Sequence, residues 1–339
     1  MALHGSDDAR LHPLGADAGD HRRSGRRQVA QLEGRLLLCR LRGRRARRRL
    51  ADVADRAASA ARRRNVPAGA GRRLSQLLSL PRAAALGLLH GPAELLPISS
   101  SAHIALVPWL LRWPYAELDD DLRKSFEVAL HAGTAVGMAV GMREQLGGAA
   151  RALNARRLLL LAIASTPAAV SGYALERPIE RRLGGAGSIA IGLVIGSAAS
   201  LLAELVAERR RWPDARIADA VSLGLAQAAA LFPGVSRSGA TVAAARARGF
   251  ARADARVLAR VAAVPVIAGA TALKAMRISR RDLPPGLRSA FAVGISAAAF
   301  SALACARAVR ALDRAGPGPV AAYRLALAGV VVQRLRSTR

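Results

Sequence analysis

Long apolar stretches recur after about residue 80, separated by short loops that carry arginine. In most of these stretches apolar residues cover the whole helix circumference, which leaves no polar face for water. They are rich in Ala and Gly, the residues that let membrane helices pack closely. Several are shorter than the ~20 residues that cross a bilayer core, so an Ala-rich soluble bundle is the competing interpretation. The pattern favours an all-α polytopic membrane helix bundle with spans at 126–142, 158–174, 188–206, 257–273, 290–305 and 320–332.

Two further stretches, 83–111 and 218–245, are apolar but interrupted. The first contains Pro92, Pro97 and three consecutive serines, and the second contains Pro233-Gly234. Non-helical backbone at membrane depth is tolerated only where it is buried in protein or lines a watery cavity. Three predicted spans lie between the interruptions, and an odd number reverses the direction of approach. We therefore predict two broken or re-entrant helices that enter from opposite faces in an inverted repeat.

Both interruptions place a Ser-x-Ser pattern shortly after a proline, at Ser99 to Ser101 and at Ser236 to Ser238. A helix that begins there presents unpaired backbone N–H groups and the positive end of its dipole, which attract anions. Arg237 adds a planar cation that can bind two phosphate oxygens. An arginine in an apolar segment is a functional candidate, although a helix-end arginine can also extend to the membrane interface.

Glu94 and His103 lie in the first interruption, with Ser100 between them. A buried Glu94 must be paired, protonated or metal-bound, and His103 can transfer protons near neutrality. Each alone could instead be a satisfied polar residue inside a helix bundle. Glu127 and His131 stand four residues apart on one predicted helix face, which fits either a pair that supports the site or a helix-end ion pair.

Composition changes this picture in one place, the first 80 residues. The chain carries 52 Lys and Arg against 23 Asp and Glu, for a net charge of +29. Arginine blocks fill the N-terminal part, which has no sustained apolar periodicity. It could be an arm that binds nucleic acid or anionic lipid; a disordered tail, or a stretch upstream of the true start, is favoured because such blocks cannot bury a core. We therefore predict an extension at 1–78 and a membrane domain at 79–339. Cys39 and Cys305 cannot form a disulfide framework.

The two interruptions also resemble known sequence signatures. Residues 91–103, GPAELLPISSSAH, resemble the first signature of the undecaprenyl-diphosphatase family, the bacitracin-resistance phosphatases. Residues 227–241, which end in PGVSRSGAT, resemble the second. Phe126-Glu127-Val128, the segment 166–169 and Tyr323-Arg324 are similar to secondary landmarks in the right order. The resemblance covers residues 80–333 and leaves residues 1–78 without a counterpart.

The resemblance implies a multi-pass protein of the bacterial inner membrane. The family removes the terminal phosphate of undecaprenyl diphosphate, which returns undecaprenyl phosphate to cell-wall synthesis. Its activity depends on a divalent cation, Mg²⁺ or Ca²⁺. The expected partners are this lipid substrate and membrane lipid; a homodimer is left open and nucleic acid is not expected. A non-enzymatic transporter or flippase of a prenyl phosphate or another anion is the alternative function, because transporters also use broken helices.

Carried onto this chain, the resemblance implies catalytic roles for Glu94, Ser100, His103 and Arg237, substrate contacts from Ser99, Ser236, Arg237, Ser238 and Thr241, and a metal near Glu94. Either Ser100 attacks phosphorus with His103 as base, or His103 activates water. One departure concerns the metal, because the family has Glu or Gln at the position of His90. Hard cations prefer oxygen ligands, so His90 is a doubtful ligand for Mg²⁺.

Overall fold

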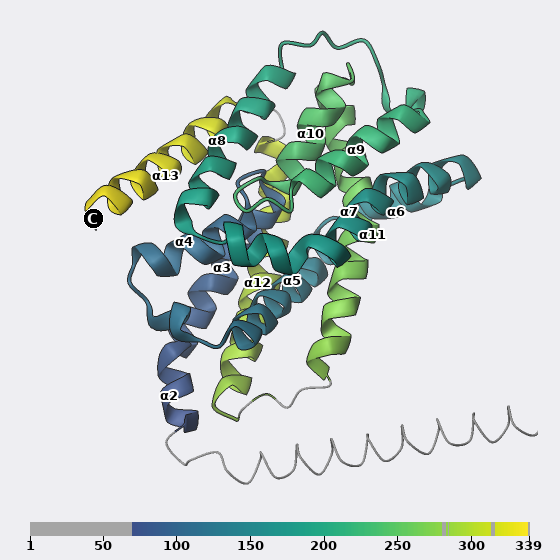
Figure 1. The fold of residues 1–339 in the computed structure, drawn as a ribbon. Coiled ribbons are helices and arrows are strands. Elements are labelled where there is room, and N and C mark those ends of the chain that lie inside the picture. Colours follow the sequence, from purple (N-terminus) through teal and green to yellow (C-terminus); the bar gives the residue numbers. More distant parts are fainter. Residues whose placement is uncertain (1–69, 280–282, 284, 313–315, 338–339) are drawn as a thin grey trace, which may run out of the picture. The chain divides into compact units, whose positions relative to one another are not determined.

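The computed structural model describes residues 70–279, 283, 285–312 and 316–337 of the chain. Within these ranges the regular structure is helical (Figure 1), and the described residues form no strand ladder, only an isolated bridge between Arg210 and Phe250. The prediction of an all-α bundle is therefore confirmed. Most of the predicted N-terminal extension, including its arginine blocks, lies outside the described residues.

Each predicted span coincides with one long helix. These helices are α5 (Asp120–Gly141), α7 (Ala155–Leu183), α8 (Ala186–Ala203), α11 (Arg252–Ser279), α12 (Pro285–Leu312) and α13 (Gly318–Ser337). In α7, α8, α11 and α12 a stretch is long and apolar enough to cross a membrane by length and composition. Shorter elements connect them: α2 (Ala70–Leu77), η1 (Pro114–Glu117), α6 (Arg143–Arg151) and η2 (Trp212–Asp214).

The two interrupted stretches are two broken helices. In the first, α3 (Leu80–Leu95) stops before Pro97 and α4 (Ser100–Leu110) begins at the serines. In the second, α9 (Ile217–Ala229) and α10 (Arg237–Ala247) flank Pro233-Gly234. Backbone in the left-handed region makes each turn, at Ser99 with φ 78° and at Gly234 with φ 93°. Glycine adopts this region without cost, whereas Ser99 is held there under strain, which is typical of functional sites.

The packing of the helices follows the order expected of two related halves. Helices α3, α4, α5, α7 and α8 correspond in sequence order to α9, α10, α11, α12 and α13. Accordingly α3 packs on α12 while α9 packs on α7, and the equivalent helices α5 with α11 and α8 with α13 pack on each other. This exchange brings the two broken helices into one bundle, as the sequence predicted.

An aromatic cluster supports the first half. The Phe126 ring meets the rings of Phe291 and Tyr115 edge-on, with centroids 5.2 and 6.3 Å apart. Leu78, at the end of α2, is buried in the same cluster, and Leu74 packs against it. The packed part of the described chain therefore includes residues that the sequence assigned to the extension, because leucines at helical spacing after residue 73 find an apolar surface to cover.

Helix α8 approaches the second break closely because it has glycine where the contact is made. A Cβ atom at Gly192 would collide with the carbonyl oxygen of Pro233, and one at Gly196 with the guanidinium of Arg324. Small residues four apart on one helix face allow this approach. The α8 glycines thus set how deeply the Pro233-Gly234 turn sits in the bundle.

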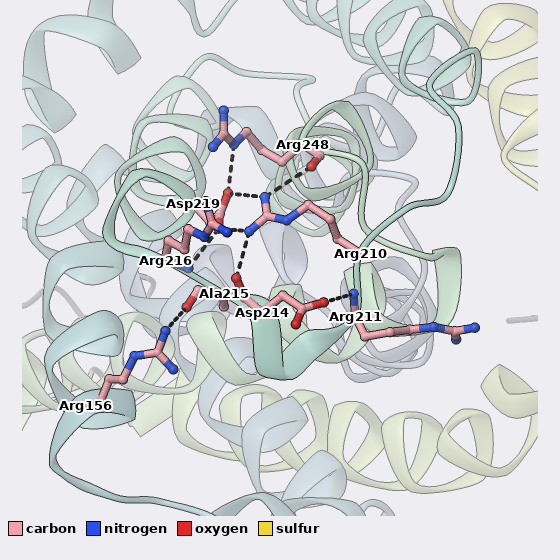
Figure 2. A network of polar contacts seen from close by, with 8 residues as sticks. All are labelled: Arg156, Arg210, Arg211, Asp214, Ala215, Arg216, Asp219 and Arg248. Atoms are coloured by element: carbon pink, nitrogen blue, oxygen red, sulfur yellow. Dashed lines mark hydrogen bonds and ion pairs between the residues drawn. The ribbon is translucent and has the colours of Figure 1, made fainter.

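The start of α9 is held by a polar network (Figure 2). Asp219, which is buried, accepts hydrogen bonds from Arg210 at 2.6 and 2.9 Å and from Arg248 at 2.8 Å. It also accepts from the backbone N–H of Arg216 at 2.8 Å. Nearby, Arg156 donates to the carbonyl oxygen of Ala215 at 2.8 Å, which ties α7 to this loop. The network fixes the entry of the second broken helix.

Candidate active site

An ion pair joins the two broken helices. Glu94 lies in the last turn of α3, Arg237 is the first residue of α10, and the guanidinium of Arg237 bonds the Glu94 carboxylate directly. Ser100, the first residue of α4, donates its hydroxyl hydrogen to the other Glu94 oxygen at 2.5 Å. The carboxylate side chain is 9% exposed. Residues 143 positions apart in sequence therefore meet at one polar centre.

A cavity of about 550 Å³ opens beside this centre. Glu94, Pro97, Arg237 and Ser238 line its polar end. Most of the remaining wall consists of apolar side chains from α5, α10 and α11, and arginines also reach it, at Arg246, Arg252, Arg256 and Arg260. A mostly apolar cavity with a few convergent polar groups is the usual form of a ligand site.

The second break arranges its hydroxyl groups around the start of α10. The Ser236 hydroxyl oxygen accepts from the backbone N–H of Gly239 at 3.2 Å, which caps the helix, and lies 3.1 Å from the hydroxyl of Ser238. Thr241 is buried, and its hydroxyl donates to the carbonyl oxygen of Arg237 at 2.8 Å. Thr241 thus braces the turn that carries Arg237, whereas Ser238 faces the cavity.

The first break leaves the start of α4 less completely capped. Ser99 occupies the N-cap position and is buried, but its side chain makes no cap hydrogen bond in the described chain and instead lies 3.3 Å from the hydroxyl of Ser101. First-turn amides without a side-chain cap can bind an anion. The two helix starts therefore differ: α10 offers a cationic side chain, and α4 offers uncapped amides.

His103 faces a different partner from the one that the sequence suggested. Its Nδ1 lies 2.7 Å from the carbonyl oxygen of Ser99, and its Nε2 lies 2.6 Å from the hydroxyl of Tyr323, whose ring stacks on it. A carbonyl oxygen only accepts, so Nδ1 carries the hydrogen and Nε2 accepts from Tyr323. The hydroxyl of Ser100 bonds Glu94 instead. The nearest base for Ser100 in this geometry is Glu94.

Arg324 is a site residue that sequence reasoning noted only as a landmark. Its side chain is 1% exposed, and its guanidinium donates to the carbonyl oxygens of Pro97, Gly192 and Gly234 at 3.3, 3.4 and 3.0 Å. One cation thereby connects both breaks and helix α8. A buried charge is costly unless hydrogen-bonded, so its presence here indicates that the relative position of the breaks matters.

A group of residues able to hold a metal shares Glu94 with the ion pair. One ligand atom each from His90, Glu94 and His131 lie within 4.8 Å of one another. His131 Nδ1 is 3.8 Å from Glu94, and the two imidazole rings meet edge to face with centroids 4.4 Å apart. The four-residue spacing predicts a pair between His131 and Glu127 on one helix face, whereas the structure places the His131 ring against His90 of α3. Two nitrogens and one carboxylate do not match the all-oxygen preference of Mg²⁺ and Ca²⁺.

Residues 83–330 match the family model described as bacitracin resistance protein BacA. The chain belongs to the BacA family. The undecaprenyl-diphosphatase of Geobacter sulfurreducens is 36% identical over 277 residues, covering 76% of this chain and 99% of the relative. That of Alcanivorax borkumensis is 39% identical over 261 residues, covering 73% and 95%. Together with its long apolar helices, membership of the BacA family makes this a multi-pass membrane protein.

Proposed function

We propose that this chain hydrolyses undecaprenyl diphosphate to undecaprenyl phosphate and inorganic phosphate in the bacterial inner membrane. Such a reaction recycles the lipid carrier of cell-wall synthesis and fits the bacitracin resistance in the family's name. The curated relatives named above are undecaprenyl-diphosphatases, and they match over nearly their whole length. The structural observation that carries the proposal is the Glu94–Arg237 pair, which joins two broken helices at the polar end of a mostly apolar cavity.

The cavity suits an amphiphilic substrate with a charged head and an apolar tail. The diphosphate binds at the polar end, where Arg237 and Ser238 supply positive charge and N–H or O–H donors. Helix α4, with its uncapped first-turn amides, begins three residues after Pro97, which also lines the cavity. The apolar wall accommodates the part of the prenyl tail next to the head, and the rest stays in lipid. Arginine suits the terminal phosphoryl group because its planar guanidinium can bind two oxygens at once.

Substrate binding exchanges the partner of Arg237. In the absence of substrate its guanidinium is neutralised by Glu94. When the terminal phosphoryl oxygens take the guanidinium, Glu94 keeps its hydrogen bond from Ser100 at 2.5 Å and gains the freedom to accept a proton. Phosphoryl transfer consists largely of positioning and charge stabilisation, so this exchange supplies much of what the reaction needs.

The geometry supports Ser100 as the nucleophile and Glu94 as its base. The Ser100 oxygen attacks the terminal phosphorus while its proton passes to Glu94, and the bond from phosphorus to the bridging oxygen breaks. Undecaprenyl phosphate leaves, and water then cleaves the phosphoserine to release inorganic phosphate. His103, bonded to Ser99 and Tyr323, positions the first break in this scheme. Because the donor set near Glu94 does not fit Mg²⁺ or Ca²⁺, no step is assigned to either ion.

The test is phosphate release by the full chain purified in detergent micelles with undecaprenyl diphosphate as substrate. We expect Arg237→Ala and Glu94→Gln to abolish release, because each removes one half of the polar centre. Arg211→Ala is the matched control, since Arg211 is an exposed arginine of the loop before α9. The transporter alternative predicts no phosphate from the wild type, and full turnover by Arg237→Ala would overturn the role of Arg237.

A further inference from the structure

The group behind Glu94 has the composition of a transition-metal site. His90 comes from α3 and His131 from α5, and each brings an imidazole nitrogen within 4.8 Å of a Glu94 oxygen and of the other imidazole. We propose that His90, Glu94 and His131 bind one late first-row dication, represented by Zn²⁺, in preference to Mg²⁺ or Ca²⁺. The inference concerns the cation of the proposed phosphatase and rests on that function only for the metal's place beside the substrate.

The distances are close to those that a tetrahedral ion needs. Zinc binds imidazole nitrogen and carboxylate oxygen at about 2.0–2.1 Å, which separates neighbouring ligand atoms by about 3.4 Å. His131 Nδ1 and Glu94 Oε2 are already 3.8 Å apart. The other separations are no more than 4.8 Å, so the ligand atoms would draw together by about 1.4 Å at most to surround an ion.

The support around His90 is also that of a metal ligand. His90 is 1% exposed, and its Nδ1 lies 2.8 Å from the hydroxyl of Thr134, itself buried in α5. When Nδ1 donates this hydrogen bond, Nε2 keeps its lone pair for a metal. Ligating histidines commonly donate their second nitrogen in this way, which fixes the ring's orientation. Thr134 follows His131 by three residues, so α5 provides both a ligand and the support of another.

The chemistry of the donors selects the ion. Imidazole nitrogen suits zinc and its neighbours in the first transition row, whereas Mg²⁺ and Ca²⁺ require several oxygen ligands. Three protein ligands are the number found in catalytic zinc sites, which keep a fourth position for water or substrate. Glu94 Oε1 faces Arg237, and Oε2, which accepts from Ser100 at 2.5 Å, is the oxygen 3.8 Å from His131 Nδ1, so an ion would take the second lone pair of Oε2.

Metal binding is measured on the full chain, purified in detergent without a histidine tag and stripped with a chelator. After equilibrium dialysis against Zn²⁺, we expect one zinc per chain by elemental analysis, not displaced by a large excess of Mg²⁺. Co²⁺ in place of zinc should give the visible absorption of a tetrahedral site. His131→Ala should weaken zinc binding by more than about 100-fold, beyond the roughly 10- to 100-fold typical of outer-shell partners.

Two variants sharpen the test. His103→Gln is the control for binding, because both nitrogens of His103 are bonded elsewhere. His90→Glu adds an oxygen ligand, and we expect its preference to shift from Zn²⁺ towards Mg²⁺. Zinc binding unchanged in both His131→Ala and His90→Glu, no tetrahedral cobalt spectrum from the wild type, or equal competition by Mg²⁺ would each overturn the proposal.

Phosphate release is measured in parallel so that the two proposals fail separately. A chain that hydrolyses undecaprenyl diphosphate but holds no zinc at these residues refutes the metal site and leaves the enzyme function standing. A chain that holds zinc through His90, Glu94 and His131 but releases no phosphate refutes the enzyme function and leaves the metal site standing. Should His131→Ala fail to fold, the cobalt spectrum and the His90→Glu preference still decide.

Discussion

Two carboxylates of this molecule, the buried Asp219 and the largely buried Glu94, bind arginine in different ways. Asp219 accepts four hydrogen bonds, from the side chains of Arg210 and Arg248 and from the backbone of Arg216 (Figure 2), which uses the full capacity of a carboxylate. Glu94 accepts from Arg237 and from Ser100, with His131 at 3.8 Å. Asp219 lies in a closed network, whereas Glu94 borders a cavity.

The difference separates a structural ion pair from a reactive one. A carboxylate whose lone pairs are all engaged cannot take up a ligand without losing a bond, so its removal should affect folding. A carboxylate with spare capacity beside a cavity can exchange partners when a charged ligand arrives. Sequence alone does not separate the two cases, since each residue is the single acid of a mostly apolar helix. Mutations should separate them through stability in one case and turnover in the other.

The largest effect is expected at Arg237. Arg237→Lys keeps the charge but loses the planar pair of donors, so we expect kcat to fall by about 10³-fold, the lower range for a catalytic arginine in phosphoryl transfer. The thermal midpoint in detergent should change little, because Lys can still pair with Glu94. A kcat within a factor of two of the wild type would show that the bidentate contact is unnecessary.

Ser100→Ala comes next. Removing the attacking oxygen should lower kcat by at least about 10²-fold. In a reaction run with substrate labelled on its terminal phosphate and then quenched, the variant should carry no labelled phosphoserine. Ser101→Ala is the matched control in the same serine run, and its trapped label should equal that of the wild type. Undiminished turnover by Ser100→Ala would instead identify water, activated by Glu94, as the nucleophile.

Arg324 tests whether the distance between the breaks matters. Its guanidinium spans carbonyl oxygens of Pro97, Gly192 and Gly234, and an ammonium group cannot reach all three. We expect Arg324→Lys to lower kcat by about 10-fold or more with KM nearly unchanged, because Arg324 acts through the position of both breaks. A fall in kcat that appears only together with a lower thermal midpoint would show that Arg324 acts through general stability.

Local chemistry explains what the sequence predicted well. Proline and glycine act on the backbone where they stand, so the breaks at Pro97 and Pro233-Gly234 could be placed from sequence, and the apolar runs predicted six helices. The sequence predicted that the breaks meet because three spans were expected between them; the Glu94–Arg237 contact is present, and two of those spans, in α7 and α8, are candidate membrane spans. These inferences need only the order of the segments along the chain and whether each helix is surrounded by lipid or by water.

Long-range packing decided what the sequence missed. His103 stands three residues from Ser100, which made it the expected base, but its ring turns towards Tyr323 on α13. His131 could be paired within its own helix by spacing, yet the packing of α5 beside α3 brings it to His90. Which neighbour a helical side chain contacts depends on the helix that packs against it, and that packing cannot be predicted from a single sequence.

In the closed network, Asp219→Asn should destabilise the protein without changing its chemistry. The substitution leaves Arg210 and Arg248 without their shared charge, and breaking a buried ion pair costs about 3–5 kcal/mol in the free energy of unfolding. The thermal midpoint in detergent should drop, while kcat per folded molecule below that midpoint should match the wild type. A selective fall in kcat with an unchanged midpoint would contradict the structural assignment.

The smallest effect concerns acid stability at Glu204, which follows the end of α8. Burial alone would raise the pKa of this carboxyl, but its hydrogen bonds and charge interactions with Arg252 and Arg246 outweigh burial and lower the pKa below its usual value. A carboxyl whose pKa is lower in the folded state stabilises the fold fully above its unfolded pKa, near 4.5. That contribution disappears as the pH falls through the folded pKa.

Glu204→Gln should therefore lower the thermal midpoint slightly at pH 7, by the equivalent of about 1 kcal/mol or less, as for partly exposed ion pairs. The gap between variant and wild type should shrink as the pH falls below about 4.5, where the unfolded wild-type carboxyl takes up a proton, and should close below the lower pKa of the folded carboxyl. Midpoints recorded in detergent between pH 7 and pH 3 check this. A gap that widens towards acid pH would mean that Glu204 is held by contacts other than its charge interactions with Arg252 and Arg246.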